Sequence, residues 1–260
     1  MVLSQNTRAF DPKLNWDSDT DNLIEDFYKK AVANCVQYDR LAGYFSSTSF
    51  ALIMKEALDF IERGGKMRLV TSHQLTKKDQ EQLKNAIEKP EEILSRNIIA
   101  ELSAETDPDL TKCVEVMGYM LANNQLEIKI AVPDSITENP HSIYHQKTGV
   151  MYFPNDEIVT FNGSVNESAL GWKFSDEDFT CFKSWHHDKT HAEGIDAHIK
   201  KFEKFWNNNA NSTKVYELPD AIKQELLKVA SKTKEDFKKT IAEVRNSSIY
   251  KTEPFAPWDC

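Results

Sequence analysis

The chain alternates between stretches with apolar residues at helical spacing and short stretches in which polar and apolar residues alternate. In "DTDNLIEDFYKKAVANCVQ", capping candidates precede an apolar repeat, which predicts a helix over about 20–36. A short aromatic strand is expected near 39–45. A second helix then runs from "STSF" to Gly64-Gly65 and leads into a strand, "KMRLVTS". The run from 39 to 72 therefore predicts a β-α-β unit.

The remainder continues this alternation. Charged, periodic residues predict helices that break near Pro90 and Pro108, followed by a strand over 126–132. Two further strands are expected in "SIYHQKTGVMYF" and "EIVTFNGS", joined by a turn at 154–156, and another in "DFTCFKSW". Helices follow in "HAEGIDAHIKKFEKFWNN" and "PDAIKQELLKVASKTKEDFKKTIAEVRN". We therefore expect an α/β layered domain with a mixed sheet and a helical C-terminal part.

Composition narrows the class of protein. With 260 residues and 40% hydrophobic content, the chain is expected to build a real core. The net charge of −9 is not the signature of a nucleic-acid binder, although a local basic cleft acts independently of the total charge. No signal peptide and no membrane span are predicted, and the four cysteines form no CxxC pair. We expect free thiols in a reducing cytoplasm.

The candidate chemistry lies on the strand pair between residues 143 and 168. In an extended strand, His145 and Lys147 would point to the same face. Just past the second strand, Gly163 allows a ligand close to the backbone, and Ser164 and Asn166 offer donors. A histidine that can act as nucleophile, a fixed cation and neutral donors together describe a pocket for a phosphoryl group.

The order and spacing of H-x-K followed by G-S-x-N resemble the HKD signature of the phospholipase D superfamily. "SDEDFTCFKSW" resembles the segment in which the nucleases of that superfamily place an acidic residue before a strand, and Glu177 aligns there. The stretch from "LAGYFS" to "VTS" resembles the opening of such domains that precede helicase modules in bacterial restriction and phage-defence proteins. The likeness covers roughly residues 20–210. It departs from the signature at Tyr152, where the superfamily often has an aspartate.

The resemblance implies a phospholipase D-like catalytic domain over residues 1–210, an α-β-α sandwich with a mixed central sheet, and a helical extension over 211–260. It implies a phosphodiesterase that needs neither metal nor cofactor. His145 would be the nucleophile, and Glu177 would orient it.

In the same implied site, Lys147, Ser164 and Asn166 would hold the phosphate oxygens. A second histidine must protonate the leaving group, and the chain has only one H-x-K with a downstream G-S-x-N. We therefore expect a homodimer with the active site on its twofold axis.

The implied function is a DNA endonuclease of a bacterial restriction or phage-defence system, with a helicase domain or subunit as a possible partner. One alternative is a non-catalytic DNA-binding or dimerisation module, such as the regulatory domain of a helicase. Phospholipid hydrolysis is disfavoured because no interfacial amphipathic helix stands out, and no membrane partner is expected.

Four histidines lie close together in "SWHHDKTHAEGIDAH", at 186, 187, 191 and 198. His187 and His191 have the i, i+4 spacing of a zinc-binding helix. However, no glutamate follows the first histidine, and Gly194 indicates a loop. A solvated loop that could contact substrate is therefore favoured over a metal site.

Overall fold

The computed structural model of the chain describes residues 10–45, 52–73, 88–103, 108–139, 141–166, 176–230 and 234–246. Within these residues the strands are β1 (Asn15–Asp17), β2 (Gln37–Ala42), β3 (Lys66–Thr71), β4 (Leu126–Pro133), β5 (Lys147–Tyr152), β6 (Ile158–Gly163), β7 (Asp178–Lys183) and β8 (Thr213–Glu217). They form one sheet in the order β1-β7-β6-β5-β2-β3-β4-β8. β3 is parallel to β2 and to β4, and the other neighbouring pairs are antiparallel. The predicted α/β class with a mixed sheet is confirmed.

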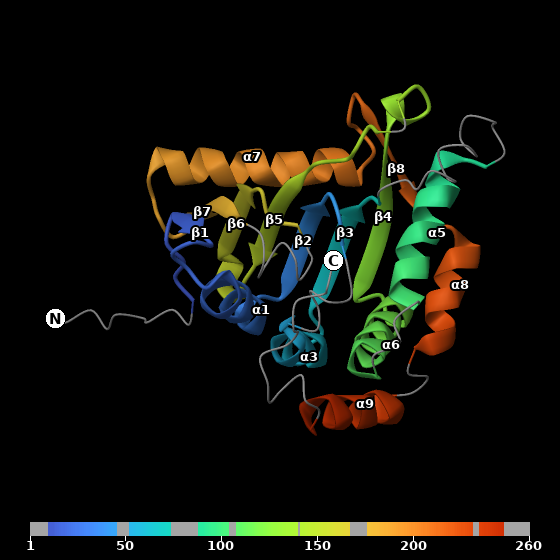
Figure 1. Cartoon of the computed structure of the whole chain (residues 1–260). Helices are drawn as coiled ribbons and strands as arrows, with labels where there is room; N and C mark the ends of the chain where they lie inside the picture. The colour runs from blue at the N-terminus through green and yellow to red at the C-terminus, as the bar shows by residue number, and fades with distance from the viewer. Residues whose placement is uncertain are drawn as a thin grey trace.

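Helices cover both faces of this sheet (Figure 1). The described helices are η1 (Leu23–Tyr28), α1 (Lys29–Asn34), α3 (Met54–Glu62), α5 (Pro90–Ser103), α6 (Pro108–Ala122), η2 (Asp134–Ile136), η3 (Pro154–Asp156), α7 (Lys189–Trp206), α8 (Asp220–Val229) and α9 (Lys234–Asn246). α7 lies across one face, and α1, α3 and α6 lie on the other. α8 packs against α5 and α6.

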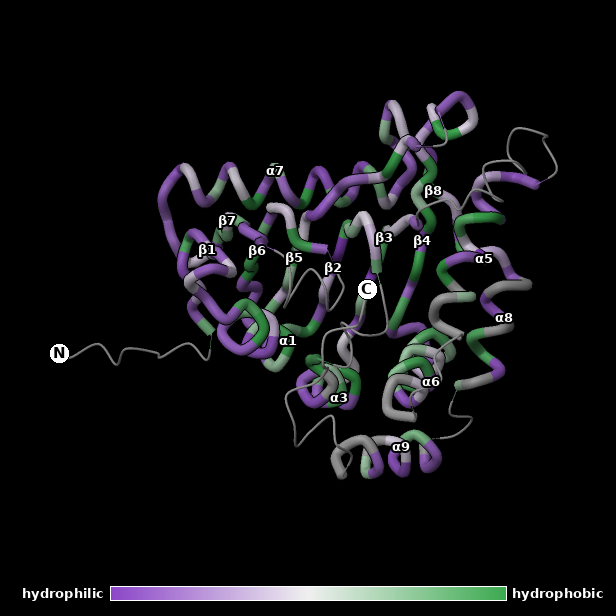
Figure 2. Tube along the Cα trace, viewed as in Figure 1, coloured by the Kyte–Doolittle hydropathy of each residue, from purple (hydrophilic) through white to green (hydrophobic). Residues whose placement is uncertain are grey.

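Each face of the sheet has its own apolar core. Under α7, the core is built from Phe202, Phe205 and Trp206 together with strand residues such as Val150. In Figure 2, α7 alternates between hydrophilic and hydrophobic residues, as expected for an amphipathic helix on a sheet. The opposite face holds a cluster of aromatic rings centred on Phe27, whose ring lies 5.1 Å from Phe161 and 4.7 Å from Phe179.

Within the described residues, the predicted helices and strands are found with small shifts at their ends, and two strands were missed. The start of the helix expected from "STSF" and the charged stretch over 74–87 lie outside the described residues. Pro90 and Pro108 begin α5 and α6, where a proline costs no helical hydrogen bond. β1 and β8 are three and five residues long and lie at the two edges of the sheet. The part expected to be helical over 211–260 therefore begins with a strand, β8, that pairs with β4, and continues into α8 and α9.

The loop expected around Gly194 is wrong, because this residue lies inside α7. The helix starts at Lys189, where the Asp188 side chain accepts a hydrogen bond from the His191 backbone N–H as an N-cap. A Cβ on Gly194 would come within 2.4 Å of the Phe182 ring. The glycine therefore serves the close packing of α7 on β7 rather than a turn.

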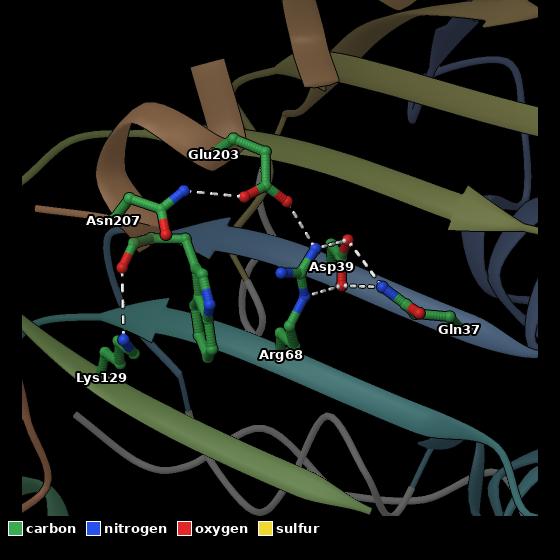
Figure 3. A network of polar contacts seen from close by, with 7 residues as sticks. Gln37, Asp39, Arg68, Lys129, Glu203 and Asn207 are labelled. Atoms are coloured by element: carbon green, nitrogen blue, oxygen red, sulfur yellow. Dashed lines mark hydrogen bonds and ion pairs between the residues drawn. The ribbon is translucent and has the colours of Figure 1, made fainter. Parts of the chain in front are cut away.

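A network of ion pairs joins α7 to the centre of the sheet (Figure 3). Asp39 is fully buried on β2 and accepts from Arg68 Nε at 2.8 Å. Arg68 also donates to Glu203 of α7 at 2.8 Å, and its guanidinium lies 4.7 Å from the Phe202 ring centroid. Pairing and stacking together stabilise the buried carboxylate of Asp39 and fix α7 above β2 and β3.

Two further observations concern the whole chain. Within the described ranges, none of the helices combines the length and the apolarity that a membrane crossing requires. Cys35, Cys113 and Cys181 are buried free thiols, as expected, and Cys260 lies outside the described residues.

Candidate active site

The residues predicted to act on phosphate gather at one end of the sheet. β5 runs antiparallel to β2, so its first residue, Lys147, is paired with Ala42 at the end of β2. The last residue of β6, Gly163, is paired with Phe179 near the start of β7. Because β5 and β6 are also antiparallel, the segment around Lys147, the segment after Gly163 and the entry to β7 meet at the same edge.

Lys147 is the buried cation of this site. Its residue is only 4% exposed, and its Nζ has no hydrogen-bond partner among the described residues. Burial and the nearby charge of Arg40 lower the pKa of Lys147 to about 8, and the carboxylate of Glu177 partly opposes them. A buried ammonium without a partner is costly, so this site is arranged to receive an anion.

Asn166 and Lys147 both lie close to Gly43, just past the end of β2. A Cβ on Gly43 would lie 3.3 Å from Lys147 Nζ, 3.2 Å from Asn166 Oδ1 and 2.8 Å from the carbonyl oxygen of Tyr144. Asn166 Oδ1 also accepts a hydrogen bond from the Tyr44 backbone N–H at 3.2 Å. This bond occupies the amide oxygen and leaves the Nδ2 group as the donor for a ligand.

Replacing Gly43 by alanine is expected to lower phosphodiesterase turnover by roughly 10- to 100-fold, because the added methyl group would displace Lys147 or Asn166. Steady-state kinetics on an oligonucleotide would measure the loss. Gly64→Ala is the matched control, since a Cβ there meets nothing within 4 Å and its positive φ costs stability only. Equal activity of Gly43→Ala and wild type would contradict the placement of Gly43 against the site.

His145 does not lie in the strand that was expected to carry it. β5 begins only at Lys147, and His145 lies in the extended segment before it, with an exposed side chain. The strand alternation that was to bring His145 and Lys147 to one face therefore does not apply. Buried residues on both sides hold the segment, since the ring of Tyr144 packs at 5.5 Å against Phe205 and Lys147 starts the strand. The imidazole is thus presented to solvent from an anchored backbone.

Gly163 and Ser164 hold β6 to the entry of β7. A Cβ on Gly163 would lie 2.0 Å from the Asp178 carbonyl oxygen, so the space we expected for a ligand is filled by β7. The Ser164 backbone N–H donates to the same carbonyl at 2.9 Å, and the Ser164 hydroxyl accepts from the Asp178 N–H at 3.0 Å. Both residues therefore fix the position of Asp178 and of its neighbour Glu177. The predicted contact of Ser164 with phosphate stays a prediction.

Glu177 is positioned by the missed strand β1. Its backbone N–H donates to Ser18 Oγ at 2.8 Å, and the Ser18 N–H donates to the Glu177 carbonyl at 2.9 Å. The Glu177 carboxylate favours the charged form of Lys147, so this carboxylate lies near the predicted site. That Glu177 orients His145 stays a prediction.

Arg40 is a residue of the site that the sequence did not single out. It is fully buried on β2, donates to the Val165 carbonyl at 2.5 Å and lies 4.9 Å from the Phe161 ring centroid. It holds the chain just before Asn166 and adds a second positive charge beside Lys147. The sequence signal that could have indicated this role was an arginine in the middle of a short strand, "QYDRLA", most of whose residues are buried.

Tyr152 occupies the position at which the superfamily often has an aspartate. Along β5 it alternates to the face opposite Lys147, where it packs with the core under α7. Burial, followed by the charge of Asp39, raises the pKa of Tyr152 to about 12. A carboxylate is therefore present on this face, supplied by β2 rather than by β5.

The fold and the site together define an α/β protein with a buried lysine and arginine at one end of a mixed sheet. No protein-family model matches the chain, and no curated protein matches it. Among solved structures, the chain is similar to NucT from Helicobacter pylori, with 12% identity and a TM-score of 0.43 over 77% of this chain and 96% of NucT.

Two other solved structures show a comparable likeness. Nuc from Salmonella typhimurium, a phospholipase D family member, is 14% identical with a TM-score of 0.39 over 73% of this chain and 88% of Nuc. Phosphatidylserine synthase from Haemophilus influenzae is 12% identical with a TM-score of 0.42 over 88% of this chain and 46% of the synthase. Similarities this distant do not assign a function to the chain, so its function is inferred from its own residues.

Proposed function

We propose that the protein is a metal-independent phosphodiesterase that acts on DNA. The observation that carries the proposal is the unpartnered ammonium of Lys147, buried beside Asn166 and Arg40 at the end of the sheet. A phosphodiester oxygen would supply a negatively charged acceptor for this ammonium. The proposed nucleophile is His145, which is exposed and lies two residues before the lysine in the sequence.

The proposed reaction has two displacement steps at phosphorus. His145 forms a P–N bond as the P–O bond to the leaving alkoxide breaks, and a second histidine gives that alkoxide its proton. A water molecule then attacks phosphorus, the second histidine takes its proton, and the P–N bond breaks to restore His145. Lys147 and Asn166 stabilise the negative charge on the non-bridging oxygens in both steps. Glu177 stabilises the charged imidazole of His145.

The proposed substrate is DNA rather than a phospholipid. Entry of a lipid requires a contiguous apolar surface around the site. In the part of the chain that the structure describes, the exposed large hydrophobic residues are Leu14, Val36, Ile143 and Tyr216. Only Ile143 is close in sequence to the site. A single exposed isoleucine fits the edge of a nucleic-acid groove better than a membrane-docking surface.

Cleavage of DNA in the presence of excess EDTA tests this function. Because no step uses a metal ion, plasmid and single-stranded DNA should be cut at the same rate with and without the chelator. A rate that falls to background in EDTA would contradict the mechanism. Binding of DNA without cleavage under any condition would instead favour the non-catalytic DNA-binding module.

The protein is expected to be a homodimer, because the second histidine must come from another copy of the chain. Sedimentation equilibrium should give twice the chain mass of 29.9 kDa at the concentrations at which the protein is active. A mixture of wild-type and His145→Ala chains gives a sharper measurement. The shared site of a mixed dimer lacks one of its two histidines, so an excess of His145→Ala chains should lower the turnover of the wild-type chains. A fully active monomer would contradict the shared site.

The wider role proposed here is that of a cytoplasmic endonuclease in a bacterial restriction or phage-defence system, with a helicase as partner. The support is the resemblance of the stretch from "LAGYFS" to "VTS" to domains that precede helicases. Co-purification of a helicase with the protein from its native cells would test it.

A further inference from the structure

We infer that His186, Asp188 and His191 form a binding site for a divalent transition-metal ion of the Zn²⁺ class, separate from the proposed catalytic site. Among the described residues, each of these three side chains offers one ligand atom, and the three atoms lie within 4.8 Å of one another. The inference goes beyond the proposed function, which uses no metal.

The three donor atoms already converge. His186 Nδ1 and His191 Nδ1 each lie 2.9 Å from the same carboxylate oxygen, Oδ2 of Asp188. The centroids of the two imidazole rings are 4.4 Å apart. Tetrahedral zinc, with bonds of about 2.0–2.2 Å to nitrogen and oxygen, holds its ligand atoms about 3.3 Å apart. Small side-chain rotations therefore make room for an ion between the three atoms.

His191 supplies an independent indication of a ligand. The residue is only 7% exposed, and its Nδ1 lies 2.9 Å from Asp188 Oδ2, an ion-pair contact that does not meet hydrogen-bond geometry. Its ring is wedged edge-on against Phe182, with centroids 5.7 Å apart. A buried imidazole nitrogen without a hydrogen bond is costly, and coordination of a metal ion would satisfy it. Ordinary pairing with aspartate accounts for His186 alone.

The backbone around the cluster is fixed before any ion binds. Asp188 uses its other carboxylate oxygen, Oδ1, to cap α7 by accepting from the His191 N–H at 3.0 Å. Oδ2 is thus oriented toward the two imidazoles. Because three protein ligands leave one position of a tetrahedral ion open, the fourth ligand would be water.

The site lies away from the proposed active site. Glu177 comes just before β7 and Ser184 just after it, so the length of β7, about 20 Å for six residues, separates them. The cluster joins the end of β7 to the start of α7. A bound ion is therefore expected to stabilise the packing of this helix on the sheet and to take no part in phosphodiester cleavage.

Titration of untagged, chelator-treated protein with Zn²⁺ and Co²⁺ tests the site. Calorimetry should show one ion per chain, and Co²⁺ should give the visible absorption of a tetrahedral complex. His186→Gln should weaken binding at least tenfold, and this exposed residue can be changed without disturbing the core. His187→Gln is the matched control, since it removes an exposed histidine of the same loop that is not a ligand and should leave binding unchanged.

Thermal unfolding gives a second readout. At a Zn²⁺ concentration 100-fold above Kd, Tm should rise by roughly 5 °C or more in wild type and in His187→Gln, but not in His186→Gln. The absence of saturable binding, or equal affinity in wild type and His186→Gln, would overturn the assignment. DNA cleavage is not part of either readout, so this inference and the proposed function can fail independently.

Discussion

Replacing His145 by alanine is expected to lower DNA phosphodiesterase turnover by roughly 1,000-fold or more. The substitution removes the atom that forms the P–N bond in the proposed reaction. The His145 side chain is exposed, so the free energy of unfolding should change by less than about 0.5 kcal/mol. In a homodimer the loss is larger than for a single group, because both the nucleophile and the general acid disappear from each site.

Single-turnover kinetics on a labelled oligonucleotide would measure this loss, with urea denaturation to show that the fold is kept. His141→Ala is the matched control, since it removes another exposed histidine only four residues earlier and should retain wild-type turnover. Turnover within tenfold of wild type for His145→Ala would contradict its assignment as nucleophile.

Replacing Lys147 by methionine is expected to lower turnover by roughly 100- to 1,000-fold while making the fold more stable at neutral pH. The ammonium is buried without a hydrogen-bond partner, so its removal relieves a desolvation cost of roughly 1–3 kcal/mol. A residue that costs stability but serves the reaction is typical of an active site. Urea denaturation and kinetics on the same preparation would measure the two opposite effects.

The lowered pKa of Lys147, about 8 against an ordinary value of 10.5, gives both effects a pH dependence. Between pH 8 and 10.5 the unfolded chain holds the proton that the folded chain has lost, so stability from this group rises with pH. The stability advantage of Lys147→Met should therefore be largest below pH 8 and vanish near pH 10.5. Conversely, kcat/KM of the wild type should fall above about pH 8, as the neutral amine no longer attracts phosphate. A rate that stays constant up to pH 10 would contradict the need for a charged Lys147.

The sequence predicted the elements around the site better than the geometry inside it. Apolar periodicity located the central strands because both of their faces are buried. β1 and β8 were missed because they are short edge strands, three and five residues long, whose pairing is set by distant partners such as β7 and β4. This matters for the candidate site, since Ser18, the residue just after β1, makes the hydrogen bonds that hold the Glu177 backbone.

Individual residues of the site show the same limit. H-x-K followed by G-S-x-N singled out Lys147 and Asn166, which both lie close to Gly43, but local spacing could not reveal that Gly163 makes room for β7. Arg40 lies on β2 and Gly43 just past its end, more than a hundred residues before Lys147, and only the pairing of β2 with β5 brings them to the lysine. The prediction of a loop around Gly194 was likewise wrong, because the packing of Gly194 against Phe182 is a tertiary contact that the local sequence does not show.

The acidic total charge of the chain and the cationic site are compatible. The net charge of the chain is −9. At the site, however, the two cations Lys147 and Arg40 are buried, and the carboxylate of Glu177 is the negative charge that acts on the lysine. Charges in a partly buried pocket are screened less than charges on the surface. If DNA is the substrate, as proposed, its affinity is expected to fall with salt, with a slope set by the few basic residues that contact phosphate.

Trapping of the covalent intermediate tests the central claim most directly. Wild-type protein mixed with labelled DNA in excess EDTA and quenched in alkaline denaturant should carry DNA attached to His145 by an acid-labile P–N bond. Peptide mapping by mass spectrometry would locate the adduct. The account predicts the adduct in wild type and its loss in His145→Ala. Cleavage in EDTA without any adduct, or an adduct at a residue other than His145, would contradict it.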